Sequence, residues 1–246
     1  MSGPPFFMPK TGGFMALRIF ETDPDAMPKG TFSDDTVGRF HSGRSVNGVP
    51  EALGEWKVTT GDPEVAAAVA QLMGGEPVET DSTSENFIEI MTGAKRVKVV
   101  LSGADAVASD MKLWNGNVLI HHCDGVEFLS PDEDRGKACG CPALMEDRKA
   151  AYKAKRGPGP SISVLFRLAE DYDLGLFRFQ TGSWKLAEVL HEIGNALDRI
   201  DGEALAELGI ELVEYTTKKG RDVSYFKPVI KVMKSWSDAI ADPKSL

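Results

Sequence analysis

The amino-acid sequence predicts an α+β fold, with mixed or antiparallel sheets and a few packed helices. Two observations lead to this prediction. Short strand patterns occur in pairs, and helical patterns interrupt these pairs instead of alternating strictly with single strands. The 246 residues are 42% hydrophobic and 26% charged, which is typical of a globular protein and excludes collagen-like or fully disordered chains.

The N-terminal part is predicted to hold a flexible arm over residues 1–16, followed by an α+β domain over residues 17–156. A helix begins after Asp62, which suits the N-cap, with Pro63 at its first position, and it ends at Gly74. Strands are predicted over residues 17–20, 56–60, 87–91, 97–101 and 118–121. The strands at 87–91 and 97–101 are expected to form a hairpin.

The C-terminal part begins at the break formed by residues 157–160 (GPGP), directly after a helix predicted over 142–156. Residues 157–246 are expected to form a second α+β domain, or one continuous unit with the first. The pattern there predicts strands over 163–168 and 176–180, an amphipathic helix over 183–201, a short turn over 203–208 and a hairpin of 210–217 with 223–232.

Charge is distributed unevenly along the chain, whose formal net charge is −9. Residues 1–147 contain 12 Lys/Arg and 23 Asp/Glu, a net charge of −11, whereas residues 148–246 contain 16 and 14, a net charge of +2. Proteins that bind duplex DNA neutralise phosphates with Lys and Arg, so this composition disfavours autonomous DNA binding. The basic segment 148–156 (RKAAYKAKR) is either a nucleic-acid or acidic-partner contact or, more commonly, a solvated helix end.

No apolar run approaches the roughly 18–20 residues of a membrane span, so we expect a soluble protein that binds no membrane. The first 13 residues have one lysine and no continuous apolar stretch, which argues against a secretion signal.

Three cysteines and two histidines gather within residues 121–142 (HHCDGVEFLSPDEDRGKACGCP). Cys123 lies on one side of an acidic, turn-rich loop, and Cys139 and Cys141 close the other side. Structural zinc takes four N or S ligands, which the two ends of a loop can supply. The sequence therefore predicts a structural zinc ion that staples this loop; the alternative is three small, partly buried cysteines with two surface histidines.

The fourth ligand is either His121 or His122. If residues 118–123 remain extended, His121 points to the same side as Cys123, because side chains alternate along a strand. If the chain has already turned there, His122 reaches the site instead. A shell rich in thiolates leaves no open position for water, so a catalytic zinc is not expected.

No catalytic constellation accompanies this cluster. The phosphate-binding, dinucleotide-binding, zinc-protease and nucleophile-elbow motifs are absent from the sequence. We therefore expect a protein that is not an enzyme and has neither catalytic nor cofactor-binding residues apart from the metal ligands.

Five segments, in order, are similar to the actinophage recombination directionality factors, which partner large serine integrases: ALRIFETDPDA, VGRFHSGRSVNGVPEAL, EWKVTTGDPEVAAAVAQLMGG, CDGVEFLSPDEDRGKACGCP and FRFQTGSWKLAEVL. The resemblance runs from about residue 17 to residue 232, and WKVTTGDP, CDGVEFL, CGCP and FQTGSW are its most specific parts. Many relatives have a further cysteine where this chain reads GPGP at 157–160.

The resemblance implies a regulator that binds a phage-encoded serine integrase on DNA, through the coiled-coil region of the integrase. It would activate excision between attL and attR, inhibit integration between attP and attB, contact DNA only through the integrase, and act in the cytoplasm of the bacterial host. Two rival functions are a metal-dependent hydrolase, such as a nuclease or phosphoesterase, and an accessory single-strand-binding protein. The first rival needs an open metal position. The second is supported only by the Lys and Arg residues of 148–156.

Overall fold

The structure, a computed structural model, describes residues 36–46, 49–82, 84–218 and 220–242. All of these described residues belong to one compact unit. The predicted flexible arm and the predicted strand at 17–20 lie outside the described residues. No helix among the described residues is long and apolar enough to cross a membrane.

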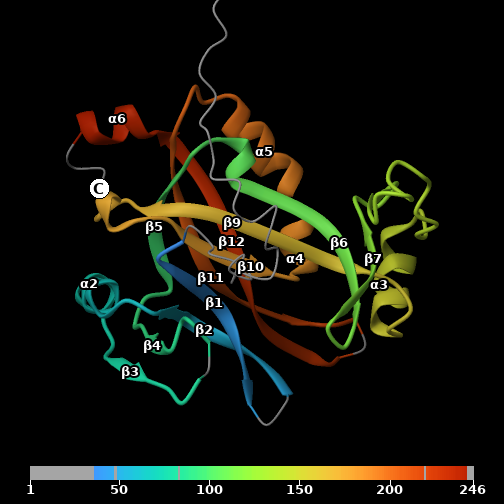
Figure 1. The fold of residues 1–246 in the computed structure, drawn as a ribbon, viewed down its shortest axis with the longest axis horizontal. Helices are drawn as coiled ribbons and strands as arrows, with labels where there is room; N and C mark the ends of the chain where they lie inside the picture. Colours follow the sequence, from blue (N-terminus) through green and yellow to red (C-terminus); the bar gives the residue numbers. More distant parts are fainter. Residues whose placement is uncertain (1–35, 47–48, 83, 219, 243–246) are drawn as a thin grey trace, which may run out of the picture. The chain divides into compact units, whose positions relative to one another are not determined.

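The predicted α+β fold is confirmed by strands and helices that share one core (Figure 1). The strands are β1 (Gly38–Val46), β2 (Val49–Thr60), β3 (Pro77–Glu79), β4 (Ile88–Met91), β5 (Arg96–Leu101), β6 (Val107–Asn115), β7 (Val118–Cys123), β8 (Phe128–Ser130), β9 (Gly159–Leu168), β10 (Phe177–Thr181), β11 (Ala204–Thr216) and β12 (Asp222–Ser235). The α-helices are α2 (Pro63–Met73), α3 (Met145–Lys153), α4 (Trp184–Ala187), α5 (Leu190–Asp198) and α6 (Trp236–Ala241). Short 3₁₀ turns are η2 (Ala104–Ala106) and η3 (Tyr172–Leu174).

The described strands form one mixed sheet in the order β12-β11-β5-β9-β10-β1-β2-β4-β3. Neighbours in this order are antiparallel except β1 and β10, which are parallel. The strands β6, β7 and β8 extend the sheet as a branch from β9. In Figure 1 this branch and α3 lie on the right, across the sheet from α2 and β3.

Strand β9 joins the two parts of the sheet. One edge pairs with β10, and the other pairs first with β6 and then with β5, at Lys112↔Gly159 and Val99↔Leu168. The turn η2 lies between β5 and β6 and lets them follow one another along the same edge. Because β9 begins within the GPGP break, its pairings connect strands from before and after the predicted domain boundary.

The core is built around fully buried aromatic rings of the central strands. Phe40 packs edge-to-face on Trp56, Phe166 and Phe177 at centroid distances of 5.7, 5.1 and 5.5 Å. Phe179 meets Trp56 in the same way at 5.1 Å. Such pairs add roughly 0.5–1.5 kcal/mol each beyond the burial of their surface, so these contacts help to hold the central strands together.

The predicted first helix is confirmed as α2, and its ends follow the sequence signals. The Asp62 carboxylate accepts a hydrogen bond from the Glu64 amide at 2.8 Å, which satisfies one free N–H of the first turn. Gly74 follows the last helical residue with φ +75°, a left-handed conformation that glycine adopts without strain.

The predicted hairpin between residues 87–91 and 97–101 is wrong. β4 pairs with β2 and β3, whereas β5 pairs with β11 and β9. Buried Thr92 directs the chain away from a tight turn, because both its amide and its hydroxyl donate to the Trp56 carbonyl, at 3.0 and 2.8 Å. The two strands therefore separate into different parts of the sheet.

The C-terminal predictions are confirmed in part. β9 pairs with β10, and β11 pairs with β12, as the predicted strand pairs require. The predicted turn at 203–208 is wrong, since these residues mostly form the first half of β11, where Ala204–Ala206 are buried. The predicted helix at 183–201 is divided into α4 and α5 at Val189, whose ψ of 1° interrupts the helical path.

Candidate metal centre

Strand β7 places His121 and Cys123 on one face and His122 on the other. The strand remains extended as it pairs with β6, with Leu113 opposite His121 and Met111 opposite Cys123. Side chains alternate along an extended strand, so the first of the two sequence alternatives for the fourth ligand is the one that the backbone adopts. The His121 ring packs against Phe128 of β8 at a centroid distance of 4.8 Å, which holds it in position.

The loop after β7 returns the chain to the same place. The Cys139 amide donates to the Val126 carbonyl at 2.8 Å, and Glu127 forms a bridge with Ala138, so the loop is closed at its base. Gly140 has φ +71°, which makes the tight turn between Cys139 and Cys141 possible. Arg148 of α3 donates to the Gly125 carbonyl at 2.8 Å and supports the start of the loop.

The four predicted ligands His121, Cys123, Cys139 and Cys141 form one cluster. Their donor atoms all lie within 4.8 Å of one another. The Sγ atoms of Cys123 and Cys141 are 3.8 Å apart, and Cys141 Sγ is 3.4 Å from His121 Nε2. All three thiols are free. This donor set can hold a metal ion, and it is complete without any contribution from residues 157–160.

The protein environment of the cluster favours its neutral forms. Burial raises the pKa of the Cys123 thiol to about 12 and also raises the pKa of Cys141. Burial, with a smaller effect of the neighbouring His122 charge, lowers the pKa of His121. A metal cation reverses this preference for the thiols, because its charge stabilises thiolates that burial alone disfavours.

His122, the other predicted candidate, lies outside the cluster. Its Nε2 is 2.8 Å from Asp110 Oδ2 on β6, and its Nδ1 is 2.9 Å from Ser130 Oγ on β8. Lys112 also contacts the Asp110 carboxylate at 2.8 Å. His122 therefore connects three neighbouring strands next to the candidate metal ligands. Asp110 and Ser130 were not predictable from the sequence as partners of His122, since their proximity to it depends on pairing between strands.

The acidic residues of the loop make other contacts and do not join the cluster. Asp132 pairs with Arg135 and Asp134 pairs with Lys137, both at 2.9 Å. Asp124 instead caps the first turn of the loop, where its carboxylate accepts from the Val126 and Glu127 amides at 2.7 and 2.8 Å. These backbone hydrogen bonds lower the pKa of Asp124. Among the described residues, the cluster thus combines thiol and imidazole groups and includes no carboxylate.

A family model named Gp3-like, described as recombination directionality factor-like, matches residues 37–233. The chain belongs to this family. The match begins just before β1, ends within β12 and includes the whole cysteine cluster. It confirms the resemblance drawn from the sequence segments. No solved structure matches the chain. The description of the family, recombination directionality factor-like, points to a regulatory protein.

Proposed function

We propose that the protein is a recombination directionality factor that binds a phage-encoded large serine integrase on its DNA sites. It activates excision between attL and attR and inhibits integration between attP and attB. The observation that carries the proposal is the family match over residues 37–233. The protein would contact the coiled-coil region of the integrase, and it would act in the cytoplasm of the bacterial host.

The protein acts through binding and needs no catalysis. A regulator shifts the equilibrium between two integrase–DNA arrangements only by binding one of them more tightly. A preference of about 100-fold corresponds to roughly 2.7 kcal/mol, which a modest protein interface supplies. Contact with DNA is indirect, through the integrase, and the net charge of −9 supports this, because it opposes the approach of phosphates.

Zinc is the proposed occupant of the cysteine cluster, with a structural role. Zn–S bonds of about 2.3 Å and Zn–N bonds of about 2.0–2.1 Å place tetrahedral donors about 3.8 Å (S to S) and about 3.5 Å (S to N) apart. In this protein the Sγ atoms of Cys123 and Cys141 are 3.8 Å apart, and Cys141 Sγ lies 3.4 Å from His121 Nε2. His121, Cys123, Cys139 and Cys141 would hold the ion, which would join β7 to the far end of the loop.

A recombination assay tests the proposal. Purified serine integrases are incubated with attL and attR, or with attP and attB, in the presence and absence of the protein. The expected result is that, with one integrase, excision requires the protein and integration is suppressed by it. An integrase panel from related phages in which no member responds would contradict the proposal, and turnover of phosphodiester substrates would then favour the hydrolase.

A further inference from the structure

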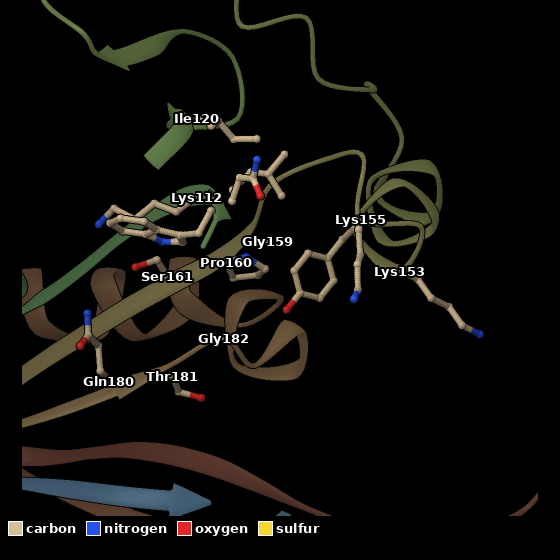
Figure 2. Close-up of a pocket in the computed structure, with 14 residues that line it drawn as sticks. Lys112, Ile120, Lys153, Lys155, Gly159, Pro160, Ser161, Gln180, Thr181 and Gly182 are labelled. Carbon is tan, nitrogen blue, oxygen red and sulfur yellow. The ribbon is translucent and has the colours of Figure 1, made fainter. Parts of the chain in front are cut away.

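A cavity of about 1050 Å³ lies between the β6–β7 hairpin and the C-terminal end of α3. Its floor is the start of β9 and the end of β10, at Pro160 and Gln180 (Figure 2). Figure 2 shows Ile120 and Lys112 on the hairpin side and Lys153 and Lys155 on the α3 side. Neither the metal cluster nor the proposed regulation accounts for this cavity.

The lining of the cavity is basic, although the chain is acidic. It contains Lys112, Lys153 and Lys155 and no Asp or Glu, whereas the whole chain has 37 acidic and 28 basic residues. Lys112 is paired with Asp110. Within the described part of the chain, Lys153 and Lys155 have no carboxylate at salt-bridge distance. The positive charge available to an occupant therefore lies at the end of α3.

The lining of the cavity also includes large apolar and aromatic side chains that are exposed. Trp114 is 54% exposed, Ile120 is 55% exposed and Tyr152 is 45% exposed. Tyrosine and tryptophan, together with arginine, are enriched among the residues that dominate binding energy at protein interfaces. An occupant with apolar groups beside carboxylates would match both properties of the surface.

Tyr152 is held in place before any partner binds. Its ring lies so close to Gly159 that a Cβ there would come within 2.4 Å of it, and its edge contacts Trp184 at a centroid distance of 5.9 Å. A side chain that is already ordered loses little conformational entropy on binding. Gly159, part of the GPGP segment, is therefore needed for the shape of the cavity.

We propose that this cavity is the docking site for the integrase, and that its occupant is an acidic, amphipathic helical segment of that partner. The proposal rests on the proposed function. Carboxylates of the segment would pair with Lys153 and Lys155, while its apolar face would cover Trp114, Ile120 and Tyr152. About two turns of a helix, roughly 11 Å long and 10–12 Å wide, match the cavity volume.

This placement gives the metal cluster a role in recognition. Strand β7 forms part of the hairpin wall of the cavity. It contributes Ile120 to the cavity lining, and the next residues along the strand include the proposed ligands His121 and Cys123. An ion that fixes β7 and its loop would thereby fix the wall against which the partner packs.

Matched variants of the full-length protein test the proposal, with the integrase whose excision the wild-type protein activates as the probe. The double variant Lys153→Glu/Lys155→Glu is compared with Lys218→Glu, an exposed lysine of the β11–β12 turn. Trp114→Ala is compared with Tyr215→Ala, an aromatic residue of β11 that is 51% exposed and outside the cavity. Zinc content and thermal unfolding establish that each variant is folded.

The cavity variants are expected to bind the integrase at least tenfold more weakly and to lose excision in proportion, whereas both control variants keep wild-type affinity. Affinity of the wild type is expected to fall as salt rises. If the wild type binds and activates an integrase but the cavity variants bind it equally well, the docking site is wrong and the proposed function stands. If no integrase responds to the wild type, the proposed function is wrong, and the docking site that rests on it is wrong as well.

A single-stranded oligonucleotide of 30 thymidines provides the competing occupant, because lysines beside aromatic rings also suit nucleic acid. The proposal expects no measurable binding of this oligonucleotide at physiological salt. Tight binding by the wild type that the double lysine variant abolishes, with integrase binding unchanged, would overturn it in favour of a nucleic-acid groove.

Discussion

Replacing each of the two adjacent histidines in turn distinguishes the loss of a proposed zinc ligand from the loss of a neighbouring imidazole that does not bind the metal. His121→Gln removes a donor atom that lies 3.4 Å from Cys141 Sγ. Structural zinc contributes about 10–16 kcal/mol in four-ligand zinc-finger peptides, so an equal share of one ligand is about 3 kcal/mol. The variant is therefore expected to bind zinc roughly 100-fold more weakly.

His122→Gln is the matched control, because it removes the neighbouring imidazole that contacts Asp110 and Ser130 instead. Losing these partly buried hydrogen bonds is expected to lower the free energy of unfolding by about 1–2 kcal/mol while zinc remains bound. Competition with a chromogenic chelator measures zinc affinity, and urea denaturation measures stability. The reasoning would be refuted if His122→Gln released zinc and His121→Gln kept it.

Three further predictions concern the core, the pH response and DNA. Trp56→Ala, at a fully buried position beneath Phe40 and Phe179, is expected to destabilise the protein by about 3–5 kcal/mol in urea titrations, and a loss under 1 kcal/mol would contradict this packing. Burial, aided by the Lys57 charge, lowers the pKa of His41 to about 4, so the unfolded chain binds the proton more readily. The free energy of unfolding should therefore fall by up to about 3 kcal/mol as pH drops from 6.5 to 4, and His41→Gln should remove this part of the loss. Finally, the protein alone is expected not to shift duplex attL or attR at physiological salt, and a sequence-specific shift would contradict the indirect contact with DNA.

Features of the fold that depend on neighbouring residues were predictable from the sequence. Asp62 and Gly74 define the ends of α2 because an N-cap and a left-handed glycine act within one helical turn. The β11–β12 hairpin is similarly local, since a short turn connects strands of alternating pattern. Pairings between distant strands were not predictable. β4 pairs with β2 and β5 pairs with β11, so β4 and β5 do not pair with each other.

Some elements lacked a sequence signal altogether. Strand β6 was not predicted. It pairs with β7 and β9, but its residues are partly buried or exposed and do not alternate between buried and exposed positions, so it has no period-two pattern. At the metal cluster, the candidate ligands could be read from the spacing of the cysteines. The choice of His121 over His122 depends on the extended conformation of β7, which the sequence left open. The cavity was not predictable, because its lining comes from α3, β6 and β9, which are distant in the sequence.

The central claim is that the protein reverses the direction of recombination by stoichiometric binding, and one titration tests it most directly. A single reaction contains a fixed amount of the responsive integrase with attL and attR and with attP and attB, and the protein is added in steps. The account predicts that excision rises and integration falls together, and that both level off near one protein per integrase. A product ratio that stays constant over the whole titration would contradict it.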